Sequence, residues 1–76
     1  MKSWSGWAEV PKNRRADTRK KIDNAAIAHR VGVHFLVESE DTDHVTFLFQ
    51  VEGKDEQVVS FKQALAAAGI RTTSKE

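Results

Sequence analysis

Two stretches in the middle of the chain alternate between apolar and polar residues, as strands with one buried face do. In the first, residues 31–38, the apolar positions are Val31, Val33, Phe35 and Val37. In the second, residues 44–52, they are Val45, Phe47, Phe49 and Val51. A period of two predicts β-strands. The short polar segment "SEDTD" between them predicts that the two strands form an antiparallel hairpin.

The buried face predicts how the two strands pair. One register gathers all the large apolar side chains on one face, and it sets Val33 opposite Phe49, Phe35 opposite Phe47, and Val37 opposite Val45. On the other face it sets Arg30 opposite Glu52. Opposite charges across a strand pair favour the pairing, so pattern and charge agree on this register.

A helix is predicted from Lys54 to Ala68, directly after the hairpin. Its apolar stripe recurs at helical spacing and consists of Val58, Phe61, Leu65 and Ala68. Asp55 and Glu56 stand in the first turn, where carboxylates favour the positive end of the helix dipole. Gly69 follows as the expected C′ residue, and Ile70 can fold back onto the last turn in a Schellman cap.

An earlier helix is predicted before the hairpin, with Asp17 as its N-cap and Gly32 beyond its end. Its apolar arc is narrow and consists of Ile22, Ala25, Ala26 and His29. Such small side chains suit a helix that lies close against a sheet.

The two ends of the chain leave alternatives open. Residues 1–12 contain Trp4, Trp7 and Val10 before Pro11, which fits either an edge strand or an apolar arm over the core. Residues 71–76 fit a flexible tail, although "IRTTS" is β-branched enough for an edge strand. The order (β)αββα(β) resembles the ferredoxin-like arrangement, an α+β two-layer sandwich with both helices on one face of the sheet. We expect residues 1–76 to form a single small domain.

The length of the chain limits the size of its core, and its composition indicates the cellular compartment. A chain of 76 residues hides only about 60% of its unfolded surface, so its core is thin. The chain has no cysteine, which excludes disulfides and thiol nucleophiles. No apolar stretch resembles a secretory signal or a membrane span. We therefore expect a cytoplasmic protein.

Charge is divided unevenly along a chain whose formal net charge is +1. Residues 1–38 hold eight Lys and Arg against four acids, and residues 39–76 hold four against seven. The basic residues gather where the first helix is predicted to begin, where cations oppose the helix dipole. They form a candidate site for an anion or a partner: Lys12, Arg14, Arg15, Arg19, Lys20 and Lys21. The alternative is a solvated helix start.

The open face of the predicted sheet is half apolar. It is expected to show His34, Leu36, Thr46 and Leu48, and the two leucines stand where water is expected. Such a face suits contact with another protein or a second copy of the chain. Its stacking platform is limited to two imidazoles, His34 and His44, which disfavours RNA binding by base stacking. Scattered surface leucines also occur without any function.

The sequence contains no recognisable catalytic or metal-binding motif. His34 and His44 share a face, but the predicted register separates them by about 13 Å, at roughly 3.3 Å per residue. They cannot share one metal ion, and no other set of ligands converges. No nucleophile with its base and no phosphate-binding glycine loop is recognisable. We expect no enzyme activity, no metal and no cofactor.

These observations favour a small non-enzymatic binding or regulatory module that acts through protein–protein contacts. The basic N-terminal segment and the half-apolar sheet face are the expected contact surfaces, and a homodimer is compatible with both. The alternative is a nucleic-acid-binding protein that uses the basic segment 12–21, whose affinity would fall steeply with salt. No membrane partner is expected.

Overall fold

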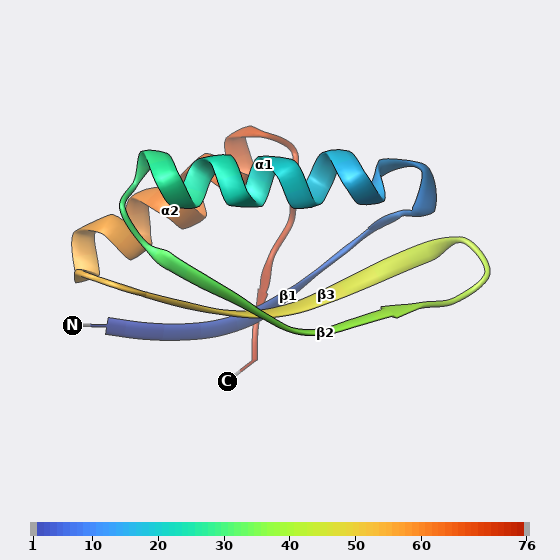
Figure 1. Cartoon of the computed structure of the whole chain (residues 1–76), viewed down its shortest axis with the longest axis horizontal. Helices are drawn as coiled ribbons and strands as arrows, with labels where there is room; N and C mark the ends of the chain where they lie inside the picture. The colour runs from blue at the N-terminus through green and yellow to red at the C-terminus, as the bar shows by residue number, and fades with distance from the viewer. Residues whose placement is uncertain (1, 76) are drawn as a thin grey trace.

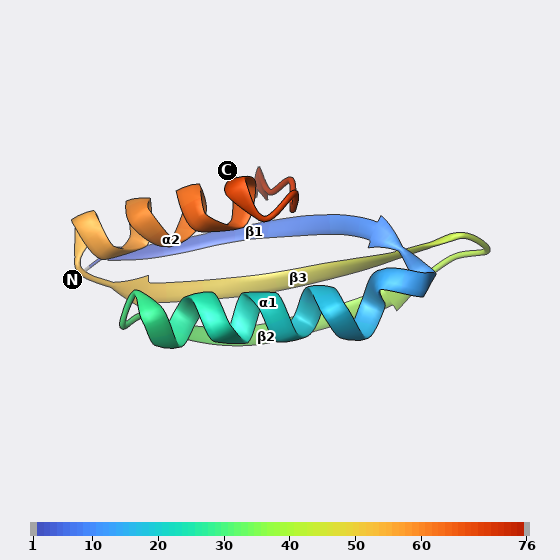
Figure 2. The same cartoon turned by 90° about the horizontal axis from the view of Figure 1, so that it is seen from above.

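The computed structural model describes residues 2–75 and contains two layers, a four-stranded antiparallel sheet and two helices on one face of it. Figure 1 shows both helices on one side of the strands. The elements in chain order are β1 (Lys2–Pro11), η1 (Lys12–Arg14), α1 (Arg15–Ala28), β2 (Gly32–Glu40), β3 (His44–Gly53), α2 (Asp55–Ala67) and β4 (Thr73–Ser74). Seen from above, α1 runs along the β2 side of the sheet and α2 along the β1 side (Figure 2). The predicted α+β class is confirmed.

The strands lie in the order β2-β3-β1-β4, and each neighbouring pair is antiparallel. Of the alternatives for residues 1–12, the strand that ends at Pro11 is confirmed, but β1 lies inside the sheet and not at its edge. Its alternation explains the position, because Trp4, Ala8 and Val10 are buried on the helix side. Pro11 ends the strand, where its missing N–H costs no sheet hydrogen bond.

The hairpin of β2 and β3 is confirmed, but the predicted register was wrong. Near its start Val33 lies opposite Val51, and Gly32 rather than Arg30 lies opposite Glu52. Arg30 instead takes a positive φ of 56° in the turn before β2. Phe35 lies opposite Phe49, two residues away from the predicted partner.

A β-bulge at Leu36 then shifts the register again. Beyond it Val37 pairs with Leu48 and Glu38 pairs with Phe47. A bulge sets two residues of one strand against one residue of the other, so the faces exchange beyond it. Val37, predicted to be buried, faces outward and is 50% exposed. Glu38 and Glu40 turn toward the helices.

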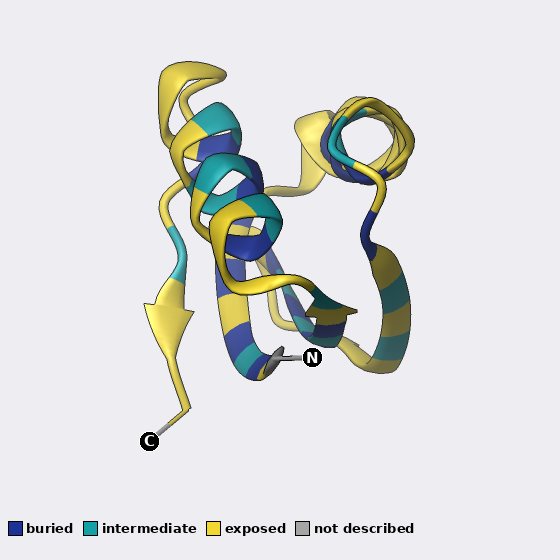
Figure 3. Ribbon diagram, turned by 90° about the vertical axis from the view of Figure 1, so that its left-hand side faces the viewer, coloured by how far each residue is buried: buried dark blue, intermediate teal, exposed yellow. Residues whose placement is uncertain are grey.

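The core lies between the sheet and the helices, and Figure 3 shows the buried residues concentrated there. The inward positions of β3 are fully buried, namely Val45, Phe47, Phe49 and Val51. From the helices the core receives Ile22, Ala26, Val58, Phe61 and Leu65. At roughly 25 cal/mol per Å² of apolar area removed from water, burial of these side chains is the main term that stabilises the fold.

The C-terminal helix agrees with its prediction. Gly69 adopts a φ of 83°. Its N–H bonds to the Ala66 carbonyl at 3.0 Å, and the Ile70 N–H bonds to the Leu65 carbonyl at 2.9 Å. These two bonds are the Schellman pattern, and Ile70 is buried beneath the last turn. Ala68 differs from the prediction, because it is exposed and Ile70 fills the space below the helix end.

The first helix begins earlier than predicted. Arg14 is its N-cap residue and α1 starts at Arg15, so Asp17 lies inside the first turn and does not cap the helix. Arg19 and Lys20 therefore lie beyond the first turn. The short helix η1 leads directly into α1, and this continuation was not visible in the apolar pattern because none of its residues is buried.

The last strand is held against β1 by close packing at Gly6. Gly6 pairs with Ser74, and Trp7 pairs with Thr73. A Cβ atom on Gly6 would lie 2.5 Å from the Trp4 ring and 2.6 Å from the Thr73 carbonyl oxygen. Only a glycine lets the strands and the Trp4 indole approach so closely. Part of the segment 71–76, predicted as a flexible tail, thus forms a two-residue strand.

Candidate functional site

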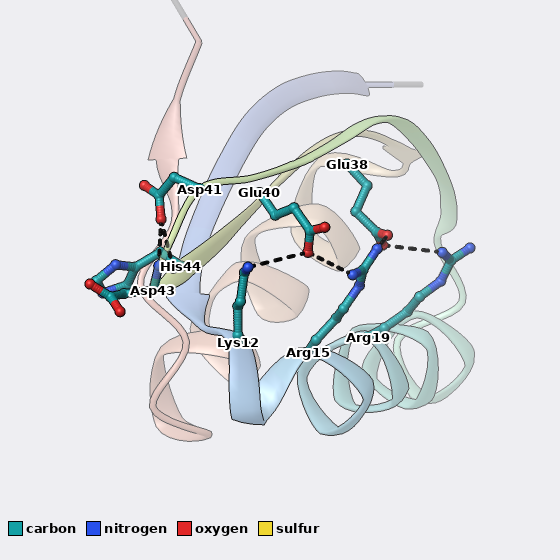
Figure 4. A network of polar contacts seen from close by, with 8 residues as sticks. All are labelled: Lys12, Arg15, Arg19, Glu38, Glu40, Asp41, Asp43 and His44. Atoms are coloured by element: carbon teal, nitrogen blue, oxygen red, sulfur yellow. Dashed lines mark hydrogen bonds and ion pairs between the residues drawn. The ribbon is translucent and has the colours of Figure 1, made fainter.

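The basic segment faces two carboxylates that β2 directs toward the helices (Figure 4). Arg15 contacts both of them, because it donates to Glu38 and lies 3.1 Å from Glu40. Lys12 Nζ lies 3.9 Å from Glu40. Arg19 lies 3.6 Å from Glu38. Cations and carboxylates thus alternate along the junction between α1 and β2.

The β-bulge at Leu36 produces this arrangement. Glu38 and Glu40 pair with Phe47 and Val45, the inward residues of β3. Both glutamates therefore stand on the helix side of the sheet, beside the core residues Phe47 and Val45. Without the bulge, Val37 would take that side and the two carboxylates would face outward. One extra residue in β2 decides which face is charged.

Electrostatics within the network favour the charged form of Arg15. The hydrogen bond that Arg15 donates to Glu38 raises the pKa of the Arg15 guanidinium above its ordinary value, and the nearby charges of Glu38 and Glu40 act in the same direction. Arg15 stays a cation throughout the physiological range. Its planar guanidinium suits contact with two carboxylates at once.

Two further contacts occupy the predicted anion site. The Arg19 guanidinium lies 4.4 Å from the centre of the Phe35 ring, a cation–π contact. Lys21 Nζ lies 3.1 Å from Asp17, one helical turn earlier. Of the six predicted site cations, Arg14 and Lys20 are the two with no ion pair to another residue of the described chain 2–75. The basic segment is largely neutralised from within.

The open face of the sheet carries the second predicted site. Thr46 and Leu48 alternate with buried residues of β3 and so face outward, both half-buried. His34 and Leu36 are exposed on β2, and Leu36 keeps 51% of its surface accessible. The structure therefore brings all four predicted residues to the same side of the sheet.

Two residues that the prediction missed enlarge this surface. Trp7 on β1 lies opposite Leu48 and is 36% exposed. Val37 lies opposite Leu48 from the other side. A shallow depression is lined by Trp7, Val37, Ser39, Thr46 and Leu48. We call Trp7, Leu36, Val37 and Leu48 the apolar patch. Alternation in β1, with Trp4 inward and Trp7 outward, is a sequence signal that would have found Trp7.

Charges are sparse around the apolar patch. Along β1, β2 and β3, as far as the structure describes them, the outward positions carry two acidic residues, Glu9 and Glu52, and two histidines, His34 and His44. Arg71 lies beside Glu9 and Trp7 at the edge toward β4. In a chain that is 30% charged, most charges therefore lie on the helix layer, the loops and the inward end of β2.

The acidic hairpin loop has a structural role of its own. The Asp41 carboxylate accepts hydrogen bonds from the backbone N–H groups of Asp43 at 2.9 Å and His44 at 2.8 Å. These bonds lower the pKa of Asp41 below its ordinary value. The Asp41 N–H donates in turn to the His44 carbonyl at 3.0 Å. The loop is thus closed by its own first carboxylate.

Among residues 2–75, no three His, Asp or Glu side chains gather in a way that could hold a metal ion. No helix in the described part of the chain is long and apolar enough to cross a membrane.

Comparisons with known proteins inform on the fold alone. No family model matches the chain, and the search of curated proteins gives no match. Among solved structures, the chain is similar to "De novo designed protein Foldit4", with a TM-score of 0.72 and 15% sequence identity over 97% of each chain. At this identity the likeness concerns the arrangement of helices and strands. It supports the small α+β fold and carries nothing on function.

Proposed function

We propose that the protein is a non-enzymatic binding module that acts through protein–protein contacts made by the open face of its sheet. The observation that carries the proposal is the apolar patch, in which side chains of three strands meet on an almost uncharged surface. Leu36 and Val37 are each about half exposed and lie side by side at the bulge. Exposed apolar side chains that gather in this way are typical of contact surfaces.

The basic segment has a smaller part in this proposal than the sequence predicted. Lys12, Arg15 and Arg19 are already engaged with Glu38 and Glu40. A nucleic acid that bound segment 12–21 would have to displace these carboxylates or rely on Arg14 and Lys20. Nucleic-acid binding therefore stays the alternative function, and the ion pairs disfavour it.

We also infer that the fold is ferredoxin-like. The order β2-β3-β1-β4 and the antiparallel pairing of all neighbours support this assignment. In such a sandwich the helices cover one face of the sheet and leave the other free for contacts.

Affinity capture from native cell extract tests the proposal, with immobilised wild type and two matched variants as bait. Val37→Lys places a cation in the apolar patch. Ile27→Lys places one on α1, at an apolar residue that is 77% exposed on the helix layer. We expect the wild type and I27K to retain the same partner, which is either another protein or a second copy of the chain. V37K should not retain that partner. Equal recovery by V37K, or no protein retained by the wild type, would overturn the proposal.

A further inference from the structure

We propose that two copies of the chain associate face to face, with their apolar patches in mutual contact. This inference rests on the proposed function and names the partner. Three properties of the open face support it: its side-chain chemistry, its charge and its area.

The side chains of the open face are suited to packing against the flat face of a second sheet. Trp7, Leu48 and Val37 lie in one row across β1, β3 and β2, because the register sets them opposite one another. Leu36 extends the row at the bulge. Uncharged polar residues border it, namely Ser39 on β2, Thr46 and Gln50 on β3, and Thr73 on β4. Sheets that pack face to face bring such side chains together across about 10 Å.

The low net charge of the open face favours a second copy of the chain over a strongly charged partner. Glu9, Glu52, Arg71 and Lys75 are the charges near the open face in the described chain, two of each sign, so two copies meet there with little net repulsion. A strongly acidic or basic partner would find its opposite charges mainly on the helix layer and in the loops. A nearly neutral surface that matches itself fits a two-fold contact, in which the same patch serves both partners.

The size of the face is also sufficient. The molecule measures 37 × 22 × 15 Å along its principal axes. The sheet face, seen from above in Figure 2, extends along the longest and the shortest of these axes and offers about 550 Å², so two copies bury about 1,100 Å², just above the roughly 1,000 Å² that a specific interface needs. A thin domain gains most from covering such a face.

Edge-to-edge pairing of two sheets is a poorer route to the dimer. The free edge at β2 is interrupted by the bulge at Leu36, and Glu38 and Glu40 point inward beyond it. Bulges and inward-pointing charged residues hinder the pairing of an edge strand with a strand of another sheet. At the other edge β4 contains two residues. The face thus remains the surface for self-association.

Sedimentation equilibrium of the full chain over a range of concentrations tests the inference. We expect a monomer–dimer equilibrium for the wild type and for Ile27→Lys. For Val37→Lys we expect the dissociation constant to rise at least about tenfold, a change that corresponds to about 1.4 kcal/mol. Thermal unfolding monitored by circular dichroism establishes that each variant is folded. Wild type that stays monomeric at every concentration, or V37K that dimerises as well as wild type, would overturn the inference.

Crosslinking through a single introduced cysteine gives a second readout, since the chain has none of its own. Thr46→Cys lies on the open face, and Asn24→Cys is exposed on α1 as the control. A short bismaleimide should join two copies of T46C and leave N24C monomeric, whereas equal crosslinking of both would contradict the face-to-face contact. A monomeric wild type that still captures another protein through Val37 would refute self-association and leave the proposed function standing.

Discussion

Arg15 in the first turn of α1 contacts Glu38 on β2, although 23 residues separate them in the chain. This ion pair joins the basic segment to the strand that follows the bulge. It shows why the clustered cations at the helix start are tolerated: their counter-charges come from β2, which the sequence places far away. It also shows that the open face owes its low charge to the same bulge.

Removal of the two carboxylates should expose the basic segment. We expect the double variant Glu38→Gln and Glu40→Gln to elute from immobilised heparin at higher salt than the wild type, because Lys12, Arg15 and Arg19 lose their internal partners. The matched control is Glu52→Gln with Glu56→Gln, which changes net charge equally at two exposed residues outside the network. Equal retention of the two double variants would show that net charge alone governs the interaction.

Deletion of Leu36 should leave the fold intact. Because Leu36 is the extra residue, its removal turns the ladder into a regular one in which Phe35 keeps Phe49 and Glu38 keeps Phe47. The ion pair between Arg15 and Glu38 should survive, and the apolar patch should shrink by one side chain. Nuclear Overhauser contacts between β2 and β3 measure the register. A change in the partner of Glu38 would contradict this explanation of the bulge.

Gly6 and Gly32 should differ in how much a methyl group destabilises the fold. We expect Gly6→Ala to destabilise the fold by about 1 to 3 kcal/mol, the usual cost of overpacking, because its Cβ would collide with Trp4 and with the Thr73 carbonyl. At Gly32 the nearest atom to a new Cβ lies 4.0 Å away, so Gly32→Ala should be close to neutral. Urea unfolding followed by tryptophan fluorescence measures both, and equal losses would contradict the packing described at Gly6.

The Asp41 loop predicts a contribution to stability that depends on pH. Because the folded-state pKa of Asp41 lies below its ordinary value, its contribution is present above the ordinary pKa and is lost as pH falls through the lowered one. Carboxyl-detected NMR titration measures this pKa directly. We expect Asp41→Ala to lower the thermal midpoint by a few degrees near neutral pH and to make less difference in strong acid. A loss of equal size at both pH values would contradict this role.

The sequence predicts much of the fold, and its failures have physical causes. Helix α2 and its C-terminal cap were predicted because the apolar stripe, the acidic residues of the first turn and Gly69 are all local signals in the sequence. Before the bulge, the register of β2 was mispredicted by two residues, a shift that leaves every side chain on the same face and is therefore invisible to alternation. Beyond the bulge it was mispredicted because Phe35, Leu36 and Val37 are all apolar, so alternation alone cannot say which of them faces the core. Contact between Glu38 and the distant Arg15 distinguishes the two arrangements. Such a contact has no local signature.

The candidate surfaces were predicted in part for the same reason. His34, Leu36, Thr46 and Leu48 lie on the open face as expected, because β3 alternates regularly and β2 alternates up to the bulge. Trp7 and Val37 were missed, since one depends on β1 lying inside the sheet and the other on the bulge. The basic segment was identified correctly as a cluster. Its internal neutralisation depends on tertiary contacts with β2.

The most direct test is a series of ¹H–¹⁵N correlation spectra recorded at rising protein concentration, or with any captured partner. Binding through the open face should shift the indole N–H of Trp7 and the amides of residues 36–39 and 46–48, and should leave residues 12–21 unchanged. Shifts confined to residues 12–21, with the open face unchanged, would contradict it and would make the basic segment the binding surface.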